Sequence, residues 1–146
     1  MFSGIIYNKG VLYNLKKFKK TSYIEIKTQM NLSKYDIGSS INTNGVCLTL
    51  TEIKKNSIFF YLSNETLIRT NFKNINIKSS INLEKSLTFG NKISGHYVQG
   101  HVDTTGCIKN ITIIDKTWNI FVEVDDKYRI HLVEKASIAL NGVSLT

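Results

Sequence analysis

The sequence predicts a mainly β protein made of two copies of one small unit, and two observations carry that prediction. Short runs rich in β-branched and aromatic residues recur along the chain, and some alternate polar and apolar positions strictly, as in residues 23–27. The hexapeptide NGVCLT at 44–49 returns as NGVSLT at 141–146, 97 residues later. Each copy is therefore expected to fold as a small barrel or sandwich of short strands.

The individual elements follow from local patterns. Strands are expected at residues 23–28, 46–53, 57–62, 80–83 and 118–124. Helices are expected only as short connectors, at residues 31–35, 64–70 and 125–133. Ser63 precedes the second connector and is a residue type that caps helix N-termini. The Asn-Gly pairs at 44 and 141 predict tight turns, because both residue types tolerate positive φ.

The repeat extends beyond the hexapeptide, at offsets of 96 and 97 residues. Its further matches are 40–41 with 137–138, 2–6 with 98–102, Gly10 with Gly106, and Leu12 with Ile108. We therefore divide the chain into an N-terminal unit, residues 1–96, and a C-terminal unit, residues 97–146. Because the first unit continues for about 47 residues after Thr49, the second is expected to be incomplete. We therefore expect the chain to be a fragment of a longer protein, or its missing half to come from elsewhere.

Composition limits the function classes. The 146 residues carry a formal net charge of +8, which raises nucleic acid or an anionic membrane surface as a partner. The only dense basic run lies at 16–20, however, and the abundance of Lys, Asn and Ile is typical of AT-rich codon usage. The sequence also lacks the closely spaced aromatic residues that single-stranded nucleic acid stacks on. Neither a nucleic-acid nor a membrane partner is therefore expected.

The cysteines and the N-terminus indicate a cytoplasmic protein. Cys47 and Cys107 have neither metal-like spacing nor a disulfide framework, which fits a reducing compartment. The first residues lack the pattern of a signal peptide, and no window approaches the roughly 20 apolar residues of a membrane span.

Two kinds of segment offer groups for chemistry. In each hexapeptide a short polar side chain stands two residues before a hydroxyl, Cys47 before Thr49 and Ser144 before Thr146, so a strand would present both on one face. A turn-and-strand role without chemistry is equally open for these segments. His96 and His101 are five residues apart and would face opposite sides of a strand, which argues against a shared metal site and leaves a structural role open for each.

The segment from Leu62 to Thr70 places small polar groups at an expected strand-to-helix junction. Backbone amides at such a junction can hold a carbonyl or an anion. An ordinary helix cap followed by a surface pair of Glu65 and Arg69 is the alternative. No phosphate loop, dinucleotide fingerprint or zinc pattern is present, so any chemistry must use hydroxyls, a thiol, histidines and backbone groups.

Taken together, these segments resemble the α-subunit family of riboflavin synthase along the whole chain and in the family's order. The matching segments are 1–6, 44–49, 63–70, 81–84, 95–103 and 135–146. The resemblance implies two six-stranded Greek-key β-barrels, each binding one 6,7-dimethyl-8-ribityllumazine, and a homotrimer. It implies transfer of a four-carbon unit between two lumazines, giving riboflavin and 5-amino-6-(ribitylamino)uracil without a metal or organic cofactor. The reacting pair would lie between the N-terminal barrel of one subunit and the C-terminal barrel of its neighbour.

The resemblance also assigns residues to two pockets. The first would use Gly4, Ile5, Ile6, Cys47, Leu48, Thr49, Tyr61, Leu62, Ser63, Asn64, Glu65 and Thr66. The second would use Gly100, His101, Val102, Lys135, Ser144, Leu145 and Thr146. The residues expected in catalysis are Cys47, Thr49, His101, Ser144, Thr146, Ser40 near the catalytic face and Phe2 near the pocket mouth.

Departures from the family pattern bear on activity. Ala136 stands where the family usually has glycine, and Asn42 occupies a position that is usually small or apolar. The second copy of the Ser63–Thr70 motif, a family acidic residue and the trimerising helix would all lie beyond Thr146. A non-catalytic lumazine- or flavin-binding protein of the same fold is the alternative function.

Overall fold

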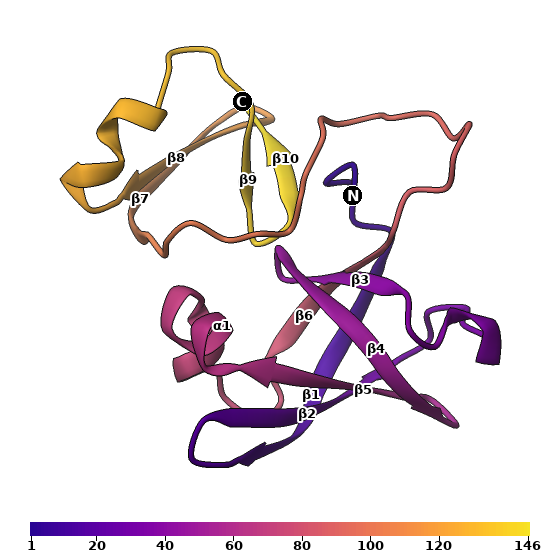
Figure 1. Cartoon of the computed structure of the whole chain (residues 1–146). Coiled ribbons are helices and arrows are strands. Elements are labelled where there is room, and N and C mark those ends of the chain that lie inside the picture. Colours follow the sequence, from indigo (N-terminus) through magenta and orange to yellow (C-terminus); the bar gives the residue numbers. More distant parts are fainter.

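The structure is a computed structural model that describes residues 1–146, and it is mainly β, as predicted. Six antiparallel strands close a barrel in the order β1-β2-β5-β4-β3-β6 (Figure 1). The strands are β1 (Asn8–Lys17), β2 (Thr21–Thr28), β3 (Ser40–Thr43), β4 (Val46–Lys54), β5 (Ser57–Ser63) and β6 (Ser80–Lys85). Strand β6 pairs with β1 on one side and β3 on the other, so the barrel has no open edge.

Alternation along the strands directs apolar side chains into the barrel. Strand β2, for example, buries Ile24 and Ile26 and leaves Lys27 outside. The interior holds fourteen buried residues, namely Leu12, Ile24, Ile26, Met30, Ile41, Val46, Leu48, Leu50, Ile58, Phe60, Leu62, Phe72, Ile81 and Leu83. Full burial of one such side chain contributes about 1.5–3 kcal/mol, so this cluster is the main source of stability in the molecule.

Helices are short connectors, as expected. The α-helix α1 (Asn64–Arg69) begins after Ser63, whose hydroxyl accepts the N–H of Thr66 at 3.1 Å, so the predicted cap is confirmed. The other predicted helices form as single 3₁₀ segments that are shorter than expected. The 3₁₀ segments are η1 (Lys34–Asp36), η2 (Asn71–Asn74) and η3 (Asp126–His131). No helix in the chain is long and apolar enough to cross a membrane.

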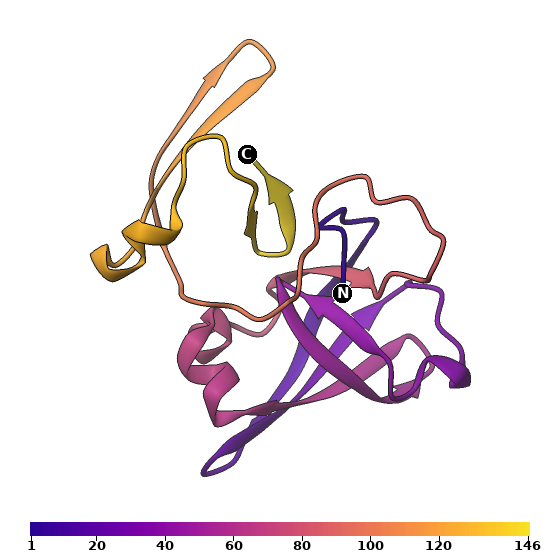
Figure 2. The same ribbon diagram turned by 45° about the horizontal axis from the view of Figure 1, so that its top comes forward.

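The remaining strands form two separate two-stranded sheets. Strand β7 (Cys107–Ile114) pairs with β8 (Thr117–Glu123), and β9 (Ile138–Leu140) pairs with β10 (Val143–Leu145). The β7–β8 hairpin extends away from the rest of the molecule (Figure 2). All eight residues of β7 are exposed, so this hairpin has no packed core.

The N-terminal segment of each unit crosses to the other unit. Phe2 and Val98 form an isolated antiparallel bridge, with N–H to carbonyl distances of 2.8 and 3.0 Å. In the repeat, residues 2–6 correspond to residues 98–102, so the bridge joins equivalent positions of the two units. Apart from this bridge, residues 95–106 form no strand. The crossing determines which residues meet at the candidate sites.

Candidate functional site

The two Asn-Gly pairs form tight turns in which all four residues have positive φ, as predicted. Asn44 and Gly45 have φ of 49° and 88°, and Asn141 and Gly142 have 47° and 82°. The turns lie back to back, because a Cβ added to Gly45 would lie 2.9 Å from the backbone nitrogen of Gly142. Both hexapeptides therefore begin at one place, where the two units meet.

Strand β4 presents Cys47 and Thr49 away from the barrel core. Leu48 is buried between them, Cys47 is half-buried and Thr49 is exposed, so the predicted shared face is confirmed. Ser40 on β3 is the register partner of Thr49 and is half-buried. The thiol and two hydroxyl-bearing residues thus come from adjacent positions of one two-stranded segment.

A segment of the second unit lies against this part of β4. The N–H of Cys47 donates to the carbonyl of Gly100 at 2.8 Å, and a Cβ added to Gly100 would lie 2.7 Å from Cys47 Cβ. Val102 packs against the core of the first barrel. Gly100 has φ of +79°, so both its backbone conformation and its close contact require glycine.

The third part of this site is the junction of β5 and α1. Strands β4 and β5 are antiparallel neighbours, and Phe60 is the register partner of Leu50. Tyr61 and the residues after it therefore lie just beyond that pair. Tyr61 is exposed, Leu62 belongs to the core, and Ser63 caps α1. Asn64, Glu65 and Thr66 form the first turn of the helix, and Glu65 pairs with Arg69. We group residues 47–49, 61–66 and 100–102 as one candidate site and call this group of residues the first cleft.

A related arrangement surrounds Ser144 on β10. The N–H of Ser144 donates to the carbonyl of Gly4 at 2.8 Å, and Nδ1 of His96 lies 2.7 Å from Ser144 Oγ. A Cβ added to Gly4 would lie 2.7 Å from Ser144 Cβ, and Gly4 has φ of +75°. We group residues 4–6, His96 and 144–146 as a second candidate site and call this group of residues the second cleft.

The other residues expected at this site have varied exposure. Ile5, Ile6 and Leu145 are half-buried, and Thr146 is exposed at the end of β10. Lys135 is exposed on the loop before β9 and has φ of +64°.

The structure corrects how the sequence analysis distributed the segments between two pockets. Residues 4–6 were expected beside Cys47, and residues 100–102 beside Ser144. The structure brings Gly4 to Ser144 and Gly100 to Cys47 instead. The physical reason is the bridge between Phe2 and Val98, which carries each segment across to the other unit. Each cleft therefore combines residues of both units.

Phe2 and the two histidines have different environments in the structure. Phe2 is fully buried, and its ring edge lies 3.0 Å from where a Gly100 Cβ would be, so it packs against Gly100. His101 is exposed. His96 was not predicted as a site residue, because the argument from strand spacing does not apply to an irregular segment. Its proximity to Ser144 depends on a contact across 48 residues of chain, which no local pattern encodes.

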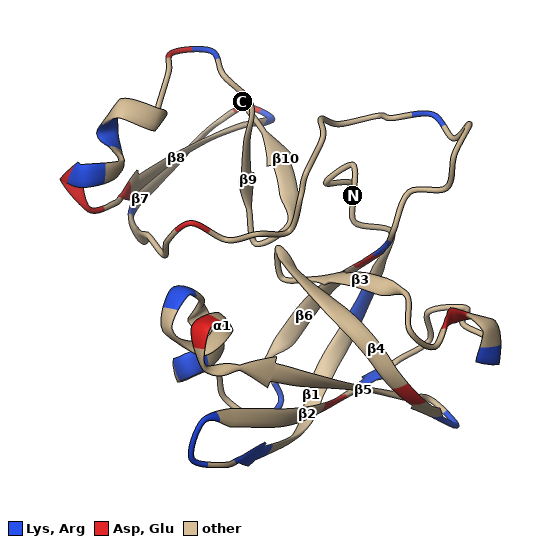
Figure 3. Cartoon of the chain, viewed as in Figure 1, with Lys and Arg blue, Asp and Glu red and all other residues tan.

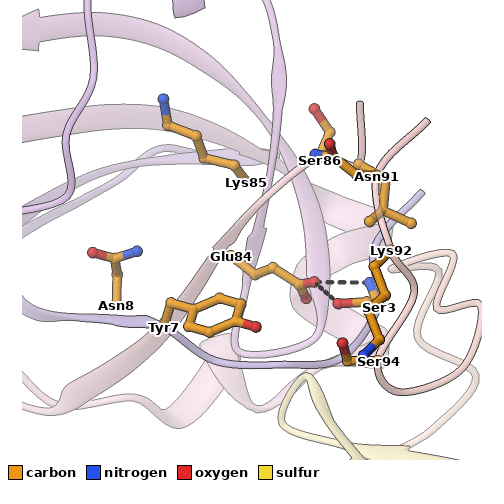
Figure 4. Close-up of a pocket in the computed structure, with 10 residues that line it drawn as sticks. Ser3, Tyr7, Asn8, Glu84, Lys85, Ser86, Asn91, Lys92 and Ser94 are labelled. Carbon is orange, nitrogen blue, oxygen red and sulfur yellow. Dashed lines mark hydrogen bonds between the residues drawn. The ribbon is translucent and has the colours of Figure 1, made fainter. Parts of the chain in front are cut away.

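A separate depression of about 370 Å³ lies beside Ser3 and Glu84 (Figure 4). Only two of its ten lining residues are apolar, and none of them belongs to either cleft. Flat heterocyclic ligands bind where apolar walls carry a few polar groups, so this polar depression is a poor match for such a ligand. The chain has no cluster of three or more His, Cys, Asp or Glu residues that could hold a metal ion.

Basic residues do not concentrate at the clefts. Lys and Arg are spread over the β1–β2 loop, the α1 region and the η3 region (Figure 3). A nucleic-acid site requires a continuous basic face, so this distribution gives no support to that class of partner.

Comparison with known proteins agrees with the duplicated architecture. The model of the family described as "Lumazine binding domain" matches residues 3–86 and 99–146. Riboflavin synthase of Actinobacillus pleuropneumoniae is 33% identical over the whole chain, which spans 68% of that protein. Riboflavin synthase of Bacillus subtilis (strain 168) is 34% identical over the same shares. The crystal structure of LumP complexed with 6,7-dimethyl-8-(1'-D-ribityl) lumazine superposes with a TM-score of 0.83 at 22% identity, covering the whole chain and 79% of LumP. That likeness concerns the fold.

Proposed function

Because this chain belongs to the riboflavin synthase family of lumazine-binding domains, we propose that it binds 6,7-dimethyl-8-ribityllumazine and takes part in its conversion to riboflavin. The observation that carries the proposal is the hydrogen bond from Cys47 to Gly100, which joins β4 to the segment of the second unit that contains Gly100. A site that holds its polar groups on packed strands is preorganised for a ligand of fixed shape.

The first cleft offers groups suited to a flat, polar ring. Cys47, Thr49 and Ser40 supply a thiol and hydroxyls along one edge. The first turn of α1 supplies backbone N–H groups and the side chains of Asn64 and Thr66 at the other edge. We infer that a pteridine ring lies between these edges.

The proposed reaction balances without an outside oxidant or reductant. Two identical lumazines react, and a four-carbon unit leaves one ring and joins the other. The acceptor becomes riboflavin and the donor becomes 5-amino-6-(ribitylamino)uracil, so all atoms of the two substrates appear in the two products. The chain's contribution is therefore positioning of two rings and proton transfer at them.

The two clefts would contribute differently to proton transfer. In the second cleft the Ser144 hydroxyl lies 2.7 Å from His96 Nδ1, so the imidazole can accept or return its proton. In the first cleft Cys47 occupies the equivalent position, and its thiol is half-buried. We infer that the second cleft is the one that exchanges protons with the substrate. His101 and Thr146, both exposed, are further candidates for proton transfer.

We extend the proposal to assembly and location. A reacting pair needs two lumazines face to face, and clefts on two subunits of a homotrimer would supply them. Cytoplasmic location is favoured by the free thiols of Cys47 and Cys107, which are typical of a reducing compartment.

A direct test is to mix the purified chain with 6,7-dimethyl-8-ribityllumazine, follow ligand fluorescence, and quantify riboflavin by chromatography. Binding with riboflavin formation is the expected result. Binding without product would favour the alternative of a non-catalytic lumazine carrier. Absence of binding at millimolar ligand, with the chain folded by circular dichroism, would contradict the proposal.

A further inference from the structure

Glu84 on β6 is a buried carboxylate surrounded by hydrogen-bond donors. It is only 5% exposed. Its Oε1 accepts the N–H and the hydroxyl of Ser3, both at 2.7 Å, as drawn in Figure 4. Its Oε2 accepts the N–H of Gly4 at 3.1 Å and the side-chain amide of Asn42 at 3.1 Å. Both oxygens therefore act purely as acceptors, toward groups from two other segments of the chain.

Asn42 on β3 continues this network to the Asn-Gly turns. Its side chain is fully buried. Its Nδ2 donates to Glu84, and its Oδ1 accepts the N–H of Gly45 at 2.8 Å. A Cβ added to Gly142 would lie 2.9 Å from the same Oδ1, so the turn of the second unit packs directly against this amide. One side chain thus contacts both turns.

Each end of the network leads to one cleft. Gly4, whose N–H is held by Glu84, presents its carbonyl to Ser144 in the second cleft. Gly45, whose N–H is held by Asn42, precedes the strand that carries Cys47 into the first cleft. A buried polar group that loses its hydrogen-bond partner destabilises the fold, so the network strongly favours a single backbone arrangement at both ends.

We propose that Glu84 and Asn42 are positioning residues, a buried carboxylate–amide pair that sets the geometry of both clefts through Gly4 and Gly45. The inference takes its ligand, lumazine, from the proposed function. The hydrogen-bond network of Glu84 and Asn42 does not depend on that proposal. Asn42 is the more specific part, because its amide links the carboxylate of Glu84 to the turn at Gly45.

A double-mutant cycle tests the contact between the two side chains. Glu84→Gln places an amide N–H₂ among donors, and we expect lumazine affinity to fall about tenfold. Asn42→Asp sets a second carboxylate against Glu84, and we expect a larger loss. In the double variant the new amide can donate to the new carboxylate, which still accepts the N–H of Gly45. Affinity is then expected to be at least about threefold better than for Asn42→Asp alone, and strict additivity of the two losses would overturn the proposed pair.

Asn42→Ala is the milder variant in case the charged substitution prevents folding. Thr28→Val is the matched control: Thr28 is also buried and hydrogen-bonded, through Lys9 and Met30, but lies away from both clefts. We expect the control to lower thermal stability while lumazine affinity stays within about twofold. Equal loss of affinity in the control and in Asn42→Ala would show general destabilisation and reject a positioning role.

The amide resonances of Gly4 and Gly45 provide a readout that needs no ligand. In ¹⁵N-labelled protein both are expected to move in Glu84→Gln and Asn42→Ala, and to stay in place in Thr28→Val. Unmoved resonances would overturn the inference whether or not lumazine binds. Moved resonances in a chain that does not bind lumazine would support the network and contradict only the proposed function.

Discussion

The two hairpins that open the two units have the same local structure but opposite burial. Each carries a register shift at the same repeat position, between Leu12 and Asn14 in β1 and between Ile108 and Asn110 in β7. In each, a glycine lies against the facing strand: a Cβ on Gly10 would meet Ile26, and one on Gly106 would meet Val122. Yet Leu12 is fully buried and Ile108 is 59% exposed.

The difference shows which features are local and which depend on the whole barrel. Pairing, bulge and glycine contact form within a hairpin, because they need only two adjacent strands. Burial needs the other strands: β2 pairs with β5, while the equivalent edge of β8 has no neighbour in the chain. Equivalent residues should therefore differ sharply in energetic importance, and matched substitutions test this.

The largest expected difference is between Leu12→Ala and Ile108→Ala. Leu12→Ala removes fully buried atoms and should lower the free energy of unfolding by about 2–5 kcal/mol. Ile108→Ala should change it by less than about 0.5 kcal/mol, because the side chain is exposed. Urea unfolding followed by circular dichroism measures both. Equal losses of unfolding free energy would mean that Ile108 is buried against another surface in solution.

The two clefts should differ in proton transfer. Ser144→Ala removes the hydroxyl beside His96, and we expect riboflavin formation to fall about 100-fold with lumazine affinity changed less than about threefold. Cys47→Ala, the equivalent change in the first cleft, should cost less in turnover. Single-turnover assays on saturated protein measure the step, and a larger loss for Cys47→Ala would reverse the assignment of the proton-exchanging cleft.

Gly100→Ala should weaken lumazine binding about tenfold, because the added methyl would collide with Cys47 at the first cleft. Gly38→Ala is the matched control: Gly38 also has positive φ, at +89°, but a Cβ there would meet nothing within 4 Å. Both variants should lose about 1 kcal/mol of stability from backbone strain. Only Gly100→Ala should affect the ligand, and fluorescence titration would show equal affinities if the close contact is unimportant.

The smallest expected effect separates Asp36 from Asp125. Asp36 is the last residue of η1 and accepts the N–H of the capping residue Ser33, whereas Asp125 itself caps η3. The Ser33 backbone N–H, and then Lys85 of β6, lower the pKa of Asp36. The pKa of Asp125 is lowered only through Lys127, within its own turn. Asp36→Asn should therefore destabilise the chain slightly, and Asp125→Asn should not do so measurably.

The sign of the pH dependence follows from the lowered pKa of Asp36. A lowered folded-state pKa stabilises the fold above the unfolded-state value, about 3.9, and this contribution disappears as pH falls through the folded-state value. The difference in melting temperature between Asp36→Asn and the unmodified chain should thus be present near neutral pH and vanish in acid. A difference that persists in strong acid would show that another contact is responsible.

Much of the fold could be predicted from the sequence, because its signals are local. Short runs rich in β-branched and aromatic residues, some of them alternating, located β2, β4, β5, β6 and β8, and the Asn-Gly pairs located both turns. Strand β1 was missed because it contains Gly10 and ends in lysines, and its glycine is explained only by contact with Ile26 across the hairpin. Strand β7 and the short strands β3, β9 and β10 were missed as well.

The candidate site was only partly predictable. The residues themselves came from motifs, but their grouping depends on the crossing of residues 2–4 and 98–100, which leaves no mark in local pattern. His96 and the Glu84–Asn42 pair are likewise defined by contacts between distant segments. Such contacts follow from topology, so spacing arguments along one segment could not reveal them.

The central claim is that lumazine binds in the first cleft, between β4, the start of α1 and the crossed segment of the second unit. The most direct measurement is the change in backbone amide resonances of the ¹⁵N-labelled chain on titration with 6,7-dimethyl-8-ribityllumazine. We predict the largest shifts at Cys47, Thr66 and Gly100, with Lys92 beside the polar depression unchanged. Shifts confined to Tyr7 and Lys92, or none in the folded chain at millimolar ligand, would contradict the account.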